Sequence, residues 1–215
     1  MKLYIYDHCP YCTRARIALA HYRHHFDTVF FANDDEAAPT ALIGVKQVPI
    51  LQKPDGTHMG ESLDIARFAA AHAGETLDET VRADIQAWFE RVQPLANRLC
   101  MPRCIKLGLP EFANVSAVAY YTEKKEAFIG TFAGHLAATP DYLAQLHGEL
   151  AILDGLIRSA DCLNGRAFGM EDVLVFPLLR NLTMVRGAVL PPAVSAYTEQ
   201  LARSHGVDLY ADRAV

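Results

Sequence analysis

Strand and helix patterns alternate along the first 73 residues of this 215-residue chain, and only helical patterns follow. Short runs of aliphatic and aromatic residues predict strands, and amphipathic spacing predicts helices between them. This order, β-α-β-α-β-β-α, restricts the first part of the chain to a small α/β domain. The predicted elements are strand 2–6, helix 13–22, strand 26–31, helix 33–43, strand 48–53, strand 57–59 and helix 61–72.

The character of the sequence changes after Gly74. The polar stretch GETLDET begins there and is typical of a linker, and every later pattern is helical. We therefore predict an α/β domain over residues 1–73, a linker over 74–79 and an all-helical domain over 80–215. The helices predicted in the second domain are 80–107, 115–133, 140–158, 170–186 and 191–205.

The charge pattern and the cysteine content exclude several classes of protein. The net charge is −5 and no basic block occurs, which argues against a nucleic-acid partner. No apolar stretch reaches the roughly 18 residues needed to span a membrane, and no secretory signal follows Met1. Five cysteines, an odd number, do not form a disulfide framework of the exported kind. We therefore expect a cytoplasmic protein with reduced thiols.

Two cysteines separated by two residues, Cys9 and Cys12, lie at the junction of the first strand and the first helix. A cysteine at a helix N-terminus has a lowered pKa, and thiol–disulfide exchange needs such a thiolate and a second thiol. We therefore predict an exposed turn with Cys9 as the nucleophile and the better-screened Cys12 as the resolving thiol. A zinc site is the alternative, but it needs four ligands, and the other closely spaced pair, Cys100 and Cys104, lies far along the chain.

Three short motifs carry a resemblance to known families. CPYC at residues 9–12 resembles the active site of the dithiol glutaredoxins. QVPI at 47–50 resembles the cis-proline loop of thioredoxin-fold proteins, and ES at 61–62 resembles the γ-glutamyl site of glutathione transferase-like proteins. With the helical second part, the chain resembles the two-domain bacterial dithiol glutaredoxins of the glutaredoxin 2 type. The resemblance implies a thioredoxin-like α/β domain followed by an all-α domain, as in glutathione transferases.

The resemblance also implies a glutathione site around the predicted third strand. The Val48–Pro49 bond would be cis, and the backbone of Val48 would pair with the cysteinyl part of glutathione; the alternative is an ordinary trans turn. Gln47 or Lys46 would reach the glycine carboxylate of glutathione. Tyr11 would line the groove, although an exposed aromatic residue without that role is equally compatible with its position.

The helix predicted to begin near Glu61 would complete this site. Ser62 would bind the γ-glutamyl carboxylate at the positive end of the helix, and Glu61 would pair with the ammonium group. The alternative is plain helix capping by Ser62, with Glu61 as a favourable charge in the first turn. Asp7 and His8 depart from the lysine or arginine that glutaredoxins often carry before the motif. His8 could favour the thiolate as a cation or be a solvated loop residue, so the cationic partner of Cys9 stays open.

These residues predict a glutathione-dependent thiol–disulfide oxidoreductase that acts on disulfide-bearing or glutathionylated proteins. Glutathione would be a co-substrate, with no tightly bound cofactor and no metal, and the protein would be a monomer. A glutathione transferase is a competing hypothesis, for which Tyr6 could supply a hydroxyl. A non-catalytic docking module is a third hypothesis, although it would not need two reactive thiols, and an iron–sulfur carrier is a fourth.

Overall fold

The computed structural model describes residues 1–215, and they form two compact units. The first unit comprises Met1–Leu77 and Gly108–Glu123, and the second comprises Asp78–Leu107 and Lys124–Val215. The chain therefore leaves the first unit, returns to it and leaves it again. The predicted fold class is confirmed, because a small mixed sheet with helices comes first and an all-helical part follows. The division into a domain over residues 1–73, a linker over 74–79 and a domain over 80–215 stays a prediction.

The first unit is built on a four-stranded sheet of strand order β2-β1-β3-β4. β1 pairs in parallel with β2 and antiparallel with β3, and β3 pairs antiparallel with β4. A short 3-10 turn and the start of α5 also belong to this unit. Its elements are β1 (Lys2–Ile5), α1 (Pro10–His21), β2 (Asp27–Phe30), α2 (Ala37–Ile43), β3 (Ile50–Gln52), β4 (His58–Met59), α3 (Ser62–His72), η1 (Pro110–Phe112) and α5 (Val115–Ile129).

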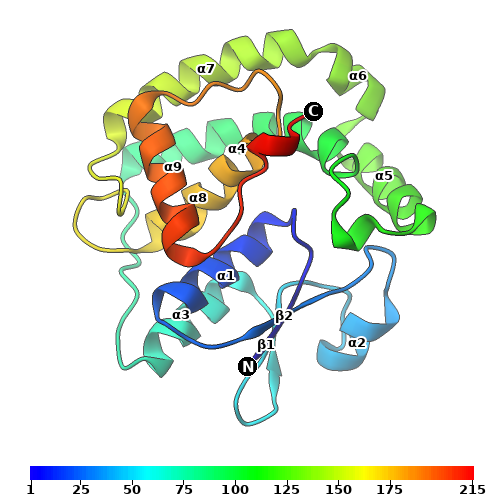
Figure 1. Cartoon of the computed structure of the whole chain (residues 1–215), viewed down its shortest axis with the longest axis vertical. Helices are drawn as coiled ribbons and strands as arrows, with labels where there is room; N and C mark the ends of the chain where they lie inside the picture. Colours follow the sequence, from blue (N-terminus) through cyan, green and yellow to red (C-terminus); the bar gives the residue numbers. More distant parts are fainter. The chain divides into compact units, whose positions relative to one another are not determined.

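The core of the first unit lies between the sheet and two helices. Leu3 pairs with Leu51 across β1 and β3, and both side chains are fully buried. α1 and α3 pack on each other, side by side in Figure 1, and contribute the fully buried Ile17 and Ile65. α2 instead contacts β3 and β4. This packing fixes the start of α1, where the two cysteines lie.

The second unit is a helical bundle around one long helix. α4 contacts α6, α7 and α8, and α9 packs on α7 and α8. The single tryptophan, Trp88 of α4, is fully buried, and its ring N–H donates to the carbonyl of Glu149 over 2.8 Å. No helix of the chain is both long and apolar enough to cross a bilayer. The elements are α4 (Ala83–Cys104), α6 (Phe132–Ala137), α7 (Thr139–Leu156), α8 (Met170–Leu182), α9 (Pro192–His205) and η2 (Ala211–Arg213).

The single helix predicted over residues 115–133 is wrong. The chain forms two helices there, because Gly130 adopts φ +95°, a conformation that interrupts an α-helix. Thr131 then caps α6, and its hydroxyl accepts a hydrogen bond from the Gly134 N–H at 3.3 Å. In a sequence, such a glycine predicts the end of one helix and the threonine after it predicts the start of the next.

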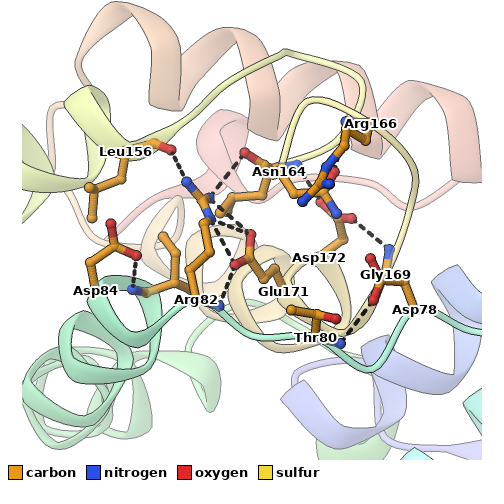
Figure 2. A network of polar contacts seen from close by, with 12 residues as sticks. Asp78, Thr80, Arg82, Asp84, Leu156, Asn164, Arg166, Gly169, Glu171 and Asp172 are labelled. Atoms are coloured by element: carbon orange, nitrogen blue, oxygen red, sulfur yellow. Dashed lines mark hydrogen bonds and ion pairs between the residues drawn. The ribbon is translucent and has the colours of Figure 1, made fainter.

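Charged residues hold the start of α8 to the start of α4 within the second unit (Figure 2). The Arg82 guanidinium donates to both oxygens of Glu171 at 2.8–3.1 Å and to the carbonyls of Leu156 and Leu163. Asp172, also buried, accepts the N–H groups of Gly169 and Leu163. These bonds satisfy backbone groups at the end of α7, in the loop that follows it and at the N-cap of α8.

Candidate active site

The strand register brings three chain ends to one edge of the sheet. Tyr4, near the carboxyl end of β1, pairs with Ile50 at the start of β3. Leu51 of β3 pairs with Met59 at the end of β4. Because both pairs are antiparallel, the carboxyl ends of β1 and β4 meet the amino end of β3.

The sequence-predicted site residues all lie on segments that meet the sheet at this edge. The cysteines follow β1, the cis-proline loop precedes β3, and the Glu-Ser pair follows β4 and opens α3. The fold therefore gathers on one side segments that are up to about fifty residues apart in the chain. The residues are Cys9, Tyr11, Cys12, Gln47, Val48, Pro49, Glu61 and Ser62.

Cys9 is the N-cap residue of α1, and Pro10 follows it at the first helical position. The proline needs no N–H partner there, so the helix can begin directly after the cysteine. Cys9 is 9% exposed and Cys12 is fully buried, which agrees with the predicted order of accessibility. The prediction of an exposed turn is wrong, however, because only Tyr11 is exposed, at 46%.

The turn is buried because the returning segment of the first unit covers it. His8, directly before Cys9, contacts Glu111 of η1 through its ring Nδ1 at 2.5 Å. The backbone N–H of His8 donates to the same carboxylate oxygen at 3.0 Å. The Glu111 side chain has no exposure. Glu111 therefore anchors the backbone before the reactive cysteine and places its carboxylate beside the imidazole ring.

Aromatic rings enclose the imidazole of His8. The ring of Tyr6 stacks with it at a centroid distance of 6.1 Å, and Phe112 stacks with it at 5.0 Å. Tyr121 of α5 approaches edge-on at 5.1 Å. Charges in such an apolar surrounding interact more strongly than they would in water.

The two thiols have pKa values displaced in opposite directions. The hydrogen bond from Cys12 is the largest influence on Cys9; it outweighs burial and, with the positive charge of His8 and backbone N–H groups, lowers the pKa of Cys9 to about 6. Burial, followed by the interaction with Cys9, raises the pKa of Cys12 well above its ordinary value. Near neutral pH the pair therefore holds one thiolate and one thiol.

Glu111 stays ionised despite its burial. Burial alone would raise the pKa of this carboxyl, but the hydrogen bonds and the charge of His8 outweigh it and lower the pKa. A buried carboxylate is retained in a folded protein when a cation or hydrogen-bond donors compensate it. The Glu111 carboxylate therefore carries its negative charge beside the ring of His8.

The peptide bond between Val48 and Pro49 is cis, which confirms the sequence prediction. Pro49 is buried, and Gln47, just before the pair, is half-buried. The Gln47 side-chain amide donates to the carboxylate of Glu61 at 2.9 Å. This bond links the proline loop to the residue that precedes α3.

Glu61 has a backbone conformation that residues other than glycine rarely adopt, with φ 61° and ψ 107°. Its side chain is exposed, whereas Ser62, the first residue of α3, is buried. No side chain caps α3 at its N-cap position. The alternative in which Ser62 caps the helix is therefore wrong in position, because Glu61 is the N-cap residue and Ser62 lies inside the helix.

Family models match both parts of the chain. Residues 84–214 match the model "Glutaredoxin 2, C terminal domain", and residues 8–72 match "Glutathione S-transferase, N-terminal domain". Glutaredoxin 2 of Escherichia coli K12 is 38% identical over 216 residues, and the match covers 100% of both chains. The chain belongs to the glutaredoxin 2 family.

This member of the glutaredoxin 2 family is a glutathione-dependent disulfide oxidoreductase with a redox-active cysteine pair. Glutaredoxin 2 from Salmonella typhimurium, solved in complex with glutathione, superposes with a TM-score of 0.96 at 38% identity, covering 100% of this chain and 98% of that one. Gtt2 from Saccharomyces cerevisiae gives a TM-score of 0.60 at 19% identity, covering 96% and 99%. The second match shows the fold alone.

Sequence reasoning missed the residues that surround His8 in this glutaredoxin. Glu111, Phe112 and Tyr121 lie about a hundred residues after the cysteine motif, beyond the predicted first domain. A signal was present, because Glu111 is an acid between apolar residues in the stretch LGLPEF. The prediction that left the cationic partner of Cys9 open lacked this contact.

Proposed function

We propose that Cys9 is the attacking thiol of the disulfide reduction and Cys12 the resolving thiol. The observation that carries the assignment is the opposite displacement of the two pKa values, with Cys9 lowered to about 6 and Cys12 raised. The thiolate is the nucleophile in thiol–disulfide exchange, and a thiol with a low pKa is also a good leaving group. Cys9 is also the cysteine with some exposure.

Glutathionylated proteins are the substrates of a one-thiol cycle. The Cys9 thiolate attacks the glutathione sulfur of the mixed disulfide, and the sulfur–sulfur bond breaks to release the protein thiolate, which takes a proton. A glutathione thiolate then attacks the glutathione sulfur bound to Cys9. Oxidised glutathione leaves, and the Cys9 thiolate is restored. Cys12 is not required in this cycle.

Protein disulfides are the substrates of a two-thiol cycle. Cys9 attacks one substrate sulfur and displaces the other as a thiolate, which takes a proton. Cys12 loses its proton and attacks the Cys9 sulfur, which releases the second substrate thiol and forms the Cys9–Cys12 disulfide. One glutathione thiolate opens this disulfide at Cys9, and a second removes the bound glutathione as oxidised glutathione.

Glutathione enters as a co-substrate and binds beside the proline loop. The backbone of Val48, next to Pro49, pairs with its cysteinyl part, and Gln47 lies toward its glycine end. The position of this loop at the cysteine-bearing edge of the sheet supports the assignment. No tightly bound cofactor is needed for the electron transfer, because the two thiols and glutathione carry the electrons.

The γ-glutamyl end of glutathione binds at the start of α3. Ser62 offers its N–H and hydroxyl to the carboxylate at the positive helix end, and Glu61 pairs with the ammonium group. The unusual backbone of Glu61 supports this role, since conformations of this kind cluster at ligand sites. Tyr11, exposed between the two cysteines, lines the groove.

The physiological setting is the cytoplasm, where glutathione keeps thiols reduced. Glutaredoxins have reduction potentials of about −200 to −230 mV, near the reduction potential of cytoplasmic glutathione. The partners are disulfide-bearing or glutathionylated proteins, and the protein acts as a monomer. The transferase alternative is supported by the N-terminal family model and by structures that are 16–20% identical, and these structures show the fold alone.

The test is glutathione-dependent reduction of a small mixed disulfide, coupled to NADPH and glutathione reductase. We expect Cys9→Ser to lose at least about 1000-fold in rate, since no other cysteine combines a lowered pKa with a helix N-terminus. Cys12→Ser should retain the mixed-disulfide activity within about tenfold and lose the reduction of protein disulfides. A fully active Cys9→Ser protein would contradict the proposal.

A further inference from the structure

We propose that Glu111 is a positioning residue that holds His8 in its imidazolium form and thereby favours the Cys9 thiolate. The proposal rests on the proposed role of Cys9 as the nucleophile. It assigns the cationic partner of the reactive thiol to a histidine that is in contact with a buried carboxylate. It also assigns control of that charge to a residue more than a hundred positions further along the chain.

The contact is specific in geometry. One oxygen of Glu111 receives both the backbone N–H of His8 at 3.0 Å and the ring Nδ1 at 2.5 Å. The second oxygen is buried and has no hydrogen-bond partner. A buried carboxylate keeps its charge when a cation or hydrogen-bond donors compensate it, and His8 supplies both contacts that Glu111 makes here.

The groups around the pair leave the imidazolium as the compensating charge. Tyr6, after β1, and Tyr121, on α5, face the ring as aromatic neighbours, and burial raises the pKa of Tyr6, so that it stays neutral. Asp7, next to His8, is paired with Arg16 of α1 at 2.7 Å.

Cys9 and Cys12 complete this surrounding on the side of α1, together with Arg14. The positive charge of His8 is among the influences that lower the pKa of Cys9. The charge of Glu111 raises the pKa of Cys12. Arg14 is itself buried and lies under the ring of Tyr11 at 4.8 Å. The pair therefore acts on both thiols in the direction that the reaction needs.

The direction in which the pKa of Cys9 changes on loss of Glu111 shows whether Glu111 acts on the thiol directly or through His8. Removing a negative charge near a thiol stabilises its thiolate, so the thiol pKa should fall. If Glu111 instead acts through His8, its loss also removes the nearer positive charge. The pKa of Cys9 should then rise by about one unit.

The experiment follows iodoacetamide alkylation of Cys9 between pH 4 and 9, with the modified site identified by mass-spectrometric fragmentation. Glu111→Gln keeps an oxygen that can accept the backbone N–H and removes only the charge. We expect its alkylation at pH 6 to be about five- to tenfold slower than in the wild type, with the pH profile displaced upward. Asp7→Asn is the matched control, because it removes a neighbouring carboxylate that is paired with an arginine; it should leave the profile unchanged or move it downward.

A His8→Gln/Glu111→Gln double variant keeps the test decisive if the single variant is unstable, since it leaves no unpaired buried charge. It should show the same upward displacement as Glu111→Gln. An unchanged or lowered profile in both variants overturns the proposal. The Cys9→Ser protein distinguishes failure of the proposed function, because a low-pKa thiol that persists in it would show that Cys9 is not the nucleophile.

Discussion

Two buried carboxylates, Glu111 in the first unit and Asp172 in the second, respond to burial in opposite ways. Both side chains are fully enclosed. The pKa of Glu111 is lowered, because the contacts with His8 outweigh burial. The pKa of Asp172 is raised to about 6, because burial outweighs the hydrogen bonds from Leu163, Gly169 and Tyr197. The comparison teaches that hydrogen-bond donors without a charge do not fully replace a cation in a buried site.

The two regions also differ in the partner of a buried carboxylate. At the start of α8 the partner of Glu171 is Arg82, whose pKa is raised further by the hydrogen bond to Glu171, so it carries its charge at every physiological pH. The Arg82 guanidinium donates to both oxygens of Glu171, whereas His8 contacts only one oxygen of Glu111.

Removing the permanent cation should have the largest effect on stability. Arg82→Met leaves Glu171, which is 1% exposed, without its ion pair. We expect a loss of about 3–5 kcal/mol in the free energy of unfolding, measured by urea denaturation, with unchanged alkylation of Cys9. Arg91→Ala is the matched control, because the Arg91–Glu149 pair is largely solvent-exposed and should contribute at most about 1 kcal/mol. Equal losses of unfolding free energy in both variants would show that burial does not determine the contribution of the Arg82–Glu171 ion pair.

The opposite pKa displacements predict opposite pH dependences of stability. For Asp172 the folded-state pKa lies above the unfolded one, so its contribution is complete below about pH 4 and is lost as the pH rises through about 6. The extra stability of the wild type over Asp172→Asn should therefore shrink by roughly 2–3 kcal/mol between pH 4 and pH 7.

For Glu111 the folded-state pKa lies below the unfolded one. Its contribution is present above the unfolded pKa and is lost as the pH falls through the folded one. The extra stability of the wild type over Glu111→Gln should therefore grow as the pH rises from about 3 to 5. Urea denaturation of the wild type, Asp172→Asn and Glu111→Gln at several pH values measures both pH dependences. If the two stability differences changed with pH in the same direction, the predicted opposite behaviour of the two carboxylates would be wrong.

The smallest effect is expected from the buried thiols of the second unit. Burial, followed by the neighbouring Cys104, raises the pKa of Cys100, and this thiol has no helix N-terminus beside it. Cys100→Ala should therefore keep the rate of mixed-disulfide reduction within about twofold and lose only about 1 kcal/mol of stability. Rapid alkylation of Cys100 in the folded protein would show that burial does not protect it.

Local features of the fold and site could be predicted from sequence. The strand before Cys9, the helix after it (predicted over 13–22 and found over 10–21) and the order of exposure of the two cysteines follow from neighbouring residues and helix geometry. The cis bond before Pro49 followed from the resemblance carried by its short motif. In each case the determining interactions lie within a few residues.

Features that depend on distant contacts could not be predicted. The turn around His8 was expected to be exposed, because nothing close in sequence shows that Glu111 and Tyr121 cover it. The break at Gly130 is different, since its signal was local and outweighed by the helical pattern on both sides. Hydrophobic periodicity identifies the elements, but it does not show which of them return to pack on an earlier one.

The contact between His8 and Glu111 joins residues 103 positions apart, and this has a consequence for biosynthesis. While the ribosome is still translating the segment before Glu111, the sheet and the cysteine motif can already exist, but His8 has no carboxylate beside it. On the role proposed for Glu111, we therefore expect the nascent protein to carry a less acidic Cys9 thiol than the finished one. We expect the difference to disappear once the returning segment has emerged and folded against His8.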